Sequence, residues 1–269
     1  MKCGDFLARL YPLFSGSKGN CYYISSSSSG ILIDAGRSAK QISEALHMNQ
    51  IDINSVRAIF ITHEHSDHIR GLNVFAGKHK IPVYSTKGTL EAMHEYSFVD
   101  ARVSYTAMDD KPVTVGEVSV DKFRTSHDSR ESCGFKINMP DGRKIAFATD
   151  LGHISDEVLT SAYGCDVVVI ESNHDVRMLQ NGSYPYQLKR RILSDCGHLS
   201  NEACASILPN LVKNGTTRFL LAHLSAENNL PELAIQAALM SLKSSKMQVD
   251  IDFTLSVAPV QTKGDFIVF

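Results

Sequence analysis

The sequence has no long hydrophobic run, no closely paired cysteines and no large excess of one charge. No apolar segment approaches the ~18 residues that a membrane-spanning helix needs, and the opening MKCGDF has Asp5 where a signal peptide would be apolar. We therefore expect a cytoplasmic protein that does not enter a membrane. The six cysteines include no CxxC motif, which argues against a zinc ribbon and a disulfide framework, and we interpret them as buried thiols.

Charge is nearly balanced, with 27 basic and 29 acidic residues. This balance gives no overall attraction to nucleic acid or to a membrane, so local groups would have to bind any polyanion. Hydrophobic residues make up 43% and charged residues 21% of the chain, which excludes a disordered or fibrous protein. We expect a single domain over residues 1–269, in which the eleven histidines are the notable feature.

Strands and helices are predicted in two successive groups. The predicted strands cover residues 6–13, 21–25, 31–36, 56–62, 82–86, 112–126, 133–139, 144–150, 167–171, 218–223 and 249–255. The predicted helices cover a segment capped by Ser38, residues 67–79, 89–95, 155–163, 186–195 and 200–213, and a segment that begins at Pro231. Serines 25–29 with Gly30 indicate a turn, and Asp141-Gly142 indicates a hairpin. This order favours two β-sheets packed face to face with helices outside.

The segment HEHSDH, residues 63–68, follows a predicted buried strand and offers four potential metal ligands. His63 and His65 can point at one ion, while Asp67 and His68, at the start of the next helix, can point at a second. Imidazole and carboxylate ligands suit zinc, manganese, iron or nickel, and disfavour a calcium site. The segment therefore predicts two adjacent divalent metal ions, with histidines in a polar surface turn as the alternative.

HEHSDH matches the HxHxDH signature of the metallo-β-lactamase superfamily, which the sequence resembles in further places. The matching strand-end residues are His127 in RTSHDS, Asp150 in IAFATDLG and His223 in FLLAHLS. The resemblance implies an α/β fold, the four-layer αββα sandwich. It also implies one metal held by His63, His65 and His127, a second held by Asp67, His68 and His223, and Asp150 as the bridge between them. Asp34 matches an aspartate that orients a ligand without binding metal, and Asp128 could compete with His127 or hold a loop end.

The segment after the bridging aspartate resembles ribonuclease Z. Only 72 residues separate Asp150 from His223, too few for the inserted nucleic-acid-binding domain of the large superfamily nucleases. In ribonuclease Z a strand-end glutamate pairs with a histidine that donates a proton to the leaving oxygen, and Glu171 and His198 match these positions. A buried structural hydrogen bond is the alternative for this pair. Ser200 is expected to cap the next helix, whose N-terminal amides could bind phosphate.

Motifs along nearly the whole chain resemble the bacterial YycJ/WalJ group. They are LFSGSKGNCYYI, HEHSDH, TSHDS, TDLG, ESNHD, GHLSN and AHLSAENN. The resemblance implies a 5′ to 3′ double-stranded DNA exonuclease linked to mismatch repair. In the turn of residues 15–20, Lys18 and Asn20 could approach a phosphate, although a plain hairpin turn fits as well. The basic run 189–191 could contact a nucleic-acid backbone or be a solvated helix face.

We predict phosphodiester hydrolysis at a centre of two metal ions, with nucleic acid, preferably DNA, as the substrate. Asp67, His198 and Glu171 are the candidate catalytic residues, with His198 protonating the leaving group to give a 5′-phosphate and a 3′-hydroxyl. The alternatives are thioester or lactone hydrolysis of the glyoxalase II and lactonase type, a small-molecule phosphodiesterase, and a metal-dependent scaffold without activity.

Overall fold

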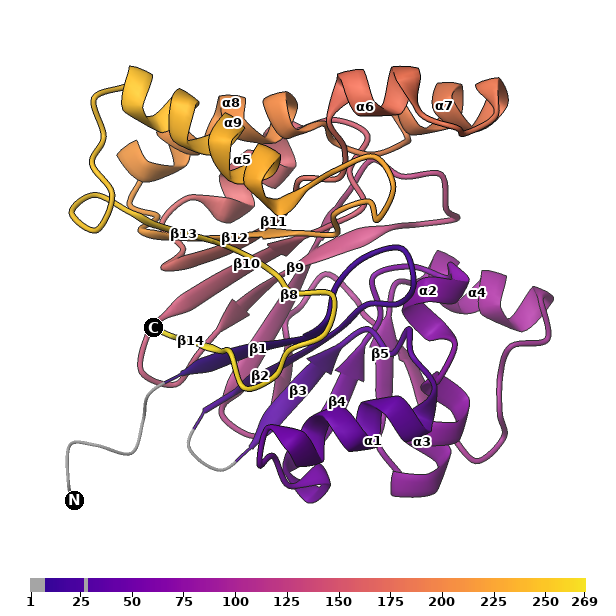
Figure 1. Cartoon of the computed structure of the whole chain (residues 1–269). Coiled ribbons are helices and arrows are strands. Elements are labelled where there is room, and N and C mark those ends of the chain that lie inside the picture. The colour runs from indigo at the N-terminus through magenta and orange to yellow at the C-terminus, as the bar shows by residue number, and fades with distance from the viewer. Residues whose placement is uncertain (1–7, 27–28) are drawn as a thin grey trace.

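Two mixed β-sheets lie face to face, with helices on their outer sides, in the computed structural model of the chain (Figure 1). The structure describes residues 8–26 and 29–269. The predictions for Asp5, for the start of the first strand and for the centre of the serine turn fall outside these residues. The layers confirm the predicted αββα sandwich.

The first sheet is built mainly from the N-terminal half of the chain. In spatial order its strands are β14 (Ile267–Val268), β1 (Arg9–Phe14), β2 (Cys21–Ser25), β3 (Gly30–Ile33), β4 (Val56–Phe60), β5 (Val83–Ser85) and β6 (Tyr105–Ala107). The helices of this half are α1 (Ala39–Met48), the 3-10 turn η1 (Ile53–Ser55), α2 (Ser66–Ile69), α3 (Leu72–His79) and α4 (Lys87–Glu95). Strands β3 to β6 are parallel, so their carboxyl ends share one edge of the sheet.

The second sheet comes from the C-terminal half. Its order is β13 (Thr254–Val257), β12 (Arg218–Ala222), β11 (Val167–Glu171), β10 (Lys144–Ala148), β9 (Cys133–Asn138), β8 (Val118–Arg124) and β7 (Val113–Val115). Its helices are α5 (Asp156–Ala162), α6 (Val176–Asn181), α7 (Tyr186–Ile192), α8 (Asn201–Lys213) and α9 (Pro231–Ser244). Strands β10 to β13 are parallel, which gives this sheet a second shared edge of carboxyl ends.

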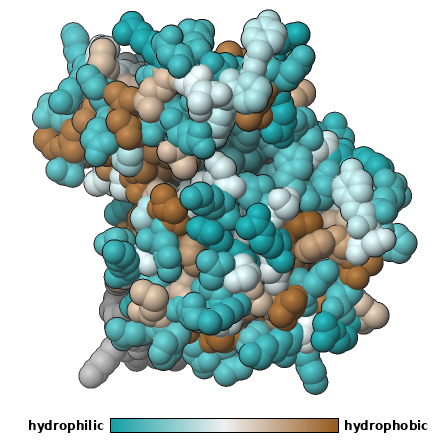
Figure 2. Space-filling view, turned by 45° about the vertical axis from the view of Figure 1, so that its right-hand side comes forward, coloured by the Kyte–Doolittle hydropathy of each residue, from teal (hydrophilic) through white to brown (hydrophobic). Residues whose placement is uncertain are grey.

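Aromatic side chains fill the space between the sheets. Tyr22 of β2 meets Phe147 of β10 edge-on at 4.8 Å between ring centroids, and Phe60 of β4 meets Phe135 of β9 at 5.7 Å. All four side chains are buried, so they hold the two sheets in fixed register through the large apolar area that aromatic rings cover. On the face seen in Figure 2, hydrophobic residues are scattered in small patches among hydrophilic ones.

The structure differs from several of the predicted elements, and the segment 112–126 forms two antiparallel strands, β7 and β8. The helix predicted over 67–79 is two helices, α2 and α3, separated at Gly71, where an added Cβ would lie 1.9 Å from the Arg37 carbonyl oxygen. The strand predicted over 249–255 is wrong for most of its length, because Asp250 adopts a φ of 62° in a turn closed by its N–H donating to the Phe253 carbonyl oxygen. Val249 and Ile251 are exposed, so the alternation there does not mark a buried face.

Within the described ranges, no helix is long and apolar enough to cross a membrane.

Candidate metal centre

The predicted ligands lie where strands of both sheets end. Asp34 follows β3, His63 follows β4, Asp150 follows β10 and His223 follows β12. Since parallel strands present their carboxyl ends at one edge, the facing sheets bring these residues together. Asp34, Asp150 and His223 have φ values of 62°, 60° and 55°, a left-handed conformation that is unfavourable for side chains other than glycine. Such backbone strain is typical of functional sites.

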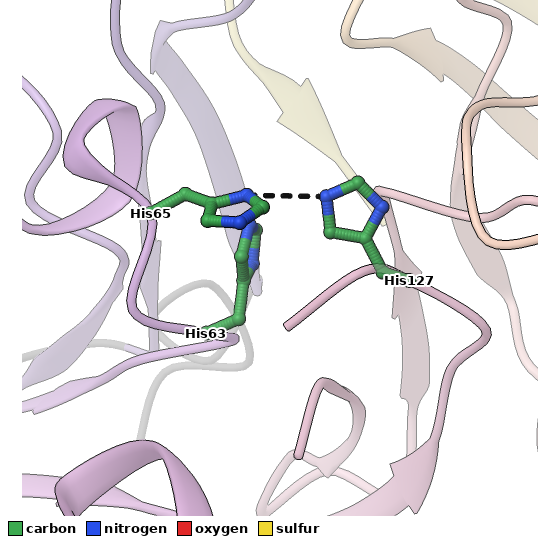
Figure 3. Close-up of side chains that lie close together, drawn as sticks. All are labelled: His63, His65 and His127. Carbon is green, nitrogen blue, oxygen red and sulfur yellow. Dashed lines mark hydrogen bonds between the residues drawn. The ribbon is translucent and has the colours of Figure 1, made fainter. Parts of the chain in front are cut away.

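His63, His65 and His127 form the first cluster, and Figure 3 shows their rings converging from two segments of the chain. His65 Nδ1 and His127 Nε2 are 3.2 Å apart. His63 and His127 are buried, whereas the His65 side chain keeps 31% of its surface exposed. The three rings can each turn one nitrogen to a common point, as three ligands of a metal ion do.

Asp67, His68 and His223 form the second cluster. His68 Nε2 lies 3.6 Å and His223 Nε2 3.7 Å from Asp67 Oδ2. Asp150 lies between the two clusters, with Oδ2 3.4 Å from His68 Nε2 and Oδ1 3.8 Å from His127 Nε2. The structure therefore brings together all seven residues that the resemblance implied as ligands, in the two predicted groups.

The donor atoms fit a divalent metal ion. Among the described residues, His63 Nε2, Asp150 Oδ2 and His223 Nε2 are buried and have no hydrogen-bond partner. Unpaired polar atoms are costly in a protein interior, so three that face one centre indicate a missing partner there. Imidazole nitrogen and carboxylate oxygen are the ligands that zinc, manganese, iron and nickel share.

Hydrogen bonds to the protein orient the rings of two cluster histidines, His68 and His127.

 Asp34 Oδ2 lies 2.7 Å from His68 Nδ1, and Asp34 Oδ1 accepts from the Thr62 N–H at 2.9 Å. The Gly197 carbonyl oxygen lies 3.0 Å from His127 Nδ1. Each of these two histidines thus uses Nδ1 to bond the protein, which leaves Nε2 for the centre and fixes the ring orientation. Asp34 lies where the resemblance placed it, behind a cluster histidine.

Glu171 is buried at the end of β11 and joins two histidines. Its Oε1 lies 2.9 Å from His198 Nδ1 and 2.7 Å from His223 Nδ1. Its Oε2 accepts from the backbone N–H groups of Leu151, at 2.8 Å, and Leu199, at 3.0 Å. The predicted contact between Glu171 and His198 is present, and the bond to His223 adds a link to the second cluster.

Burial and neighbouring charges determine the pKa values in this centre. Although burial opposes its protonation, the carboxylates of Asp34, Asp150 and Asp67 raise the pKa of His68 to about 9. Burial favours the neutral acid of Glu171, but His198 and His223 hold the pKa of its carboxyl well below the ordinary range. Burial and the neighbouring histidines lower the pKa of His63. Glu171 is therefore ionised and His63 neutral at neutral pH, whereas His68 carries a proton that a metal ion would have to displace, because neutral imidazole is the form that binds metal.

A pocket of about 230 Å³ opens onto both clusters. His65, Asp67, His127, Asp150, His198 and His223 line it on the metal side. The turn before α7 and the helix itself contribute Tyr184, Leu188, Arg191 and Ile192 to the rest of the lining. His198 is thus brought to the same space as the two clusters.

The three predicted substrate-binding residues have different environments, and none belongs to the described lining of this pocket. Lys18 is exposed in the turn after β1, next to the lining residue Ser17. Asn20 is buried, accepts from the Gly16 N–H at 3.0 Å and lies 3.2 Å from His68 Nε2. Ser200 caps α8 as predicted, with Oγ accepting from the Ala203 N–H at 3.1 Å. Their contact with substrate stays a prediction.

The structure adds supporting residues that the sequence analysis missed. Ser15 Oγ accepts from the His223 N–H at 2.9 Å and from the Tyr22 hydroxyl at 2.7 Å. The Asn173 side-chain amide donates to the His223 carbonyl oxygen at 2.9 Å. These contacts fix the strained backbone of His223 on both sides. No local pattern indicates them, because Ser15 and His223 are 208 positions apart.

Comparisons with known proteins show the family to which the chain belongs. The family model described as the β-lactamase superfamily domain matches residues 30–224. The chain is 40% identical to the exodeoxyribonuclease YycJ of Bacillus anthracis, over 82% of this chain and 84% of that one. It is 38% identical to the exodeoxyribonuclease WalJ of Streptococcus pneumoniae, over 90% of both chains.

Among solved structures, the metallo-β-lactamase fold protein YhfI from Bacillus subtilis superimposes with a TM-score of 0.73. That match covers 98% of this chain and all of the other, at 14% sequence identity, and so bears on the fold alone. The family model and the two curated relatives agree on one assignment. The chain belongs to the metallo-β-lactamase superfamily.

Proposed function

We propose that this protein is a metal-dependent exonuclease that hydrolyses DNA from the 5′ end of a duplex. The observation that carries the proposal is the pocket where two metal-binding clusters, joined by Asp150, lie beside a histidine held by Glu171. The relatives that cover most of the chain are exodeoxyribonucleases, which supports DNA as the polymer. Hydrolysis of a phosphodiester requires the charge neutralisation and proton donation that these groups can provide.

Two divalent ions fit the residues of the centre. His63, His65 and His127 would hold one, Asp67, His68 and His223 the other, and Asp150 would bridge them. When bound, such ions supply an activated water molecule and neutralise charge on the phosphoryl oxygens. The same ligand set accepts zinc, manganese, iron or nickel. Asp34 and Glu171 would hold His68 and His223 in orientation for this role.

His198 is suited to protonate the leaving oxygen. Glu171 bonds its Nδ1, so Nε2 can carry the proton that the 3′ oxygen needs when its bond to phosphorus breaks. The His198 side chain is 13% exposed and lines the pocket, which places it within reach of a bound substrate. The predicted products are a 5′-phosphate and a 3′-hydroxyl.

Support for attack at a strand end comes from the two relatives that cover most of the chain, because both are named exodeoxyribonucleases.

The test uses duplex and single-stranded DNA and RNA, each labelled at the 5′ or the 3′ end and digested with each candidate metal. We expect the 5′ label on duplex DNA to be released first, as a mononucleotide. A matched control is His94→Gln, which alters an exposed histidine and should behave like the wild type. Release of internal fragments, or degradation of RNA alone, would contradict the proposal.

Two small substrates separate the alternatives. Turnover of bis-p-nitrophenyl phosphate without degradation of any polymer would indicate a small-molecule phosphodiesterase. Turnover of a thioester or lactone alone would indicate the carbonyl hydrolases of the superfamily. Normal metal content with no turnover of any of these compounds would indicate a scaffold without activity.

A further inference from the structure

The basic run Lys189-Arg190-Arg191 lies on α7, and its three side chains have different environments. Lys189 Nζ donates to the backbone carbonyl oxygens of Gln180 and Gly182 at 2.9 and 2.7 Å, so it connects α7 to the end of α6. The Arg190 guanidinium lies 5.9 Å from the centre of the Tyr186 ring, and both side chains are exposed. Arg191 lines the metal-side pocket. Only the third cation of the run reaches the candidate site.

Arg191 is held there by Asp128, the residue after the cluster member His127. The guanidinium donates to both carboxylate oxygens, and the bond from Nη2 to Oδ1 measures 2.8 Å. Asp128 Oδ1 also lies 3.4 Å from His127 Nε2. The ion pair therefore holds the guanidinium beside the cluster of His63, His65 and His127, and its bidentate geometry limits rotation of the guanidinium.

Stability does not account for this arrangement. The Arg191 side chain is 44% exposed and that of Asp128 33% exposed, and ion pairs this open to water add little to stability. Two of the five guanidinium N–H groups bond Asp128, which leaves others available to a ligand in the pocket. Among the described residues that line the pocket, Arg191 is the only lysine or arginine.

We propose that Arg191 binds a phosphate of the DNA strand adjacent to the phosphodiester that is cleaved, and that Asp128 is the positioning residue that orients it. Planar guanidinium groups match the geometry of phosphate oxygens, whereas a flexible lysine does not. The proposal rests on the proposed exonuclease function. It adds a local cation that contributes to binding of the polymer, since a chain with nearly balanced charge gives no overall attraction to nucleic acid.

The first test compares Arg191→Gln with Arg190→Gln, which removes the same charge from the adjacent, exposed position. We expect R191Q to raise the KM for duplex DNA by roughly 10- to 100-fold, the effect of losing hydrogen bonds to a charged group. The rise in the KM of R191Q for bis-p-nitrophenyl phosphate, which has no adjacent phosphate, should be at least tenfold smaller. R190Q should stay within about twofold of the wild type on DNA. Equal losses for R191Q and R190Q would overturn the proposal.

Salt dependence provides a measurement that a purely structural role would not change. Duplex DNA is titrated by fluorescence anisotropy in the His198→Gln background, which slows cleavage. Removing one phosphate contact should lower the slope of log K against log salt by about 0.9, or by about 0.7 if the strand is single. R191Q should show this decrease and R190Q should not. An unchanged slope in R191Q would contradict a phosphate contact.

Asp128→Asn tests the positioning role. We expect a higher KM for DNA with kcat largely retained, and Asp128→Glu should restore part of the loss. In the double variant D128N/R191Q, the loss should be no larger than in R191Q alone, because the two residues act through one contact. A fall in the metal content of D128N would show instead that Asp128 acts on the cluster, and would overturn its assignment as a positioning residue.

The two proposals fail in different ways. If the wild type does not degrade DNA, the proposed function is wrong and this inference falls with it. If the wild type degrades DNA while R191Q matches R190Q in KM and salt slope, only the inference is wrong.

Discussion

The two sides of the pocket differ in burial and in how firmly their residues are held. The inner wall, which we define as the metal-centre residues His63, His68, Asp150, Glu171 and His223, is almost fully buried, and two of these residues, Asp150 and His223, line the pocket directly. Except for Asp150, its members hydrogen-bond to one another or to buried partners such as Asp34 and Thr62. The outer wall, which we define as Tyr184, Leu188 and Arg191, is half-buried or exposed, and its charged member is fixed by one exposed ion pair.

This difference indicates that the inner wall is suited to the chemical step and the outer wall to binding the polymer. Groups that perform chemistry on a phosphodiester need fixed orientation and a dry environment, because electrostatic effects are stronger where water is excluded. Groups that recognise a long, flexible polymer need access to solvent and tolerate movement. Substitutions in the inner wall should therefore act on metal content and kcat, and substitutions in the outer wall on KM and salt dependence.

Removing metal should give the largest loss of activity, because it acts directly on the residues of the inner wall. Dialysis against a chelator is expected to abolish DNA hydrolysis, and a divalent ion should restore it, because the ions that the two clusters would hold activate water and neutralise charge on the phosphoryl oxygens. His63→Ala should lose activity without restoration. Elemental analysis of the purified protein measures the metal content of both samples. Full turnover by the metal-free protein would show that the clusters are not catalytic.

Replacing His198 should give the next largest effect. We expect His198→Ala to lower kcat by roughly 10² to 10⁴, the range of a general acid, while metal content stays at the wild-type level. For a substrate with a p-nitrophenolate leaving group, which needs no proton, the same variant should show a much smaller decrease in kcat. An equal loss on both substrates would show that His198 supports the structure of the centre and does not donate a proton.

Asp34→Asn sharpens the comparison, because it changes a residue that supports the inner wall without replacing any of the proposed metal ligands. The variant weakens the bond that orients His68, and such changes typically lower metal affinity by about 10- to 100-fold. Titration of the metal-free variant with zinc or manganese measures the affinity. At saturating metal, kcat should recover most of the wild-type value. Wild-type affinity would mean that Asp34 does not orient this ring.

The sequence predicts the inner wall well because its signals are local. HEHSDH places four groups within six residues, and strand ends mark Asp150 and His223. The bond between Glu171 and His223 is not visible in the sequence, because it depends on the register of β11 with β12. In that register Glu171 is opposite Ala222, so His223 follows immediately and its ring reaches the same carboxylate.

The outer wall is harder to predict, because it depends on how α7 packs. Three adjacent cations look alike in sequence, yet only the packing of α7 against the pocket separates Arg191 from Arg190. A similar limit explains the strand wrongly predicted over 249–255, where polar and apolar residues alternate although Val249 and Ile251 face solvent. Alternation reports a buried face only when another layer covers it.

Lys18→Ala should give the smallest effect and tests whether the outer side of the pocket acts as one charged surface. Lys18 is exposed beside the lining residue Ser17, so any contact with a phosphate remains well hydrated and mobile. Charges at such a rim change association rates modestly, and we expect a rise in the KM for DNA of about two- to threefold with kcat unaffected. Stopped-flow binding at two salt concentrations measures the association rate. A rise in KM as large as that of R191Q would mean that phosphate binding is shared by the exposed cations around the pocket. The ion pair with Asp128 would then give Arg191 no special role.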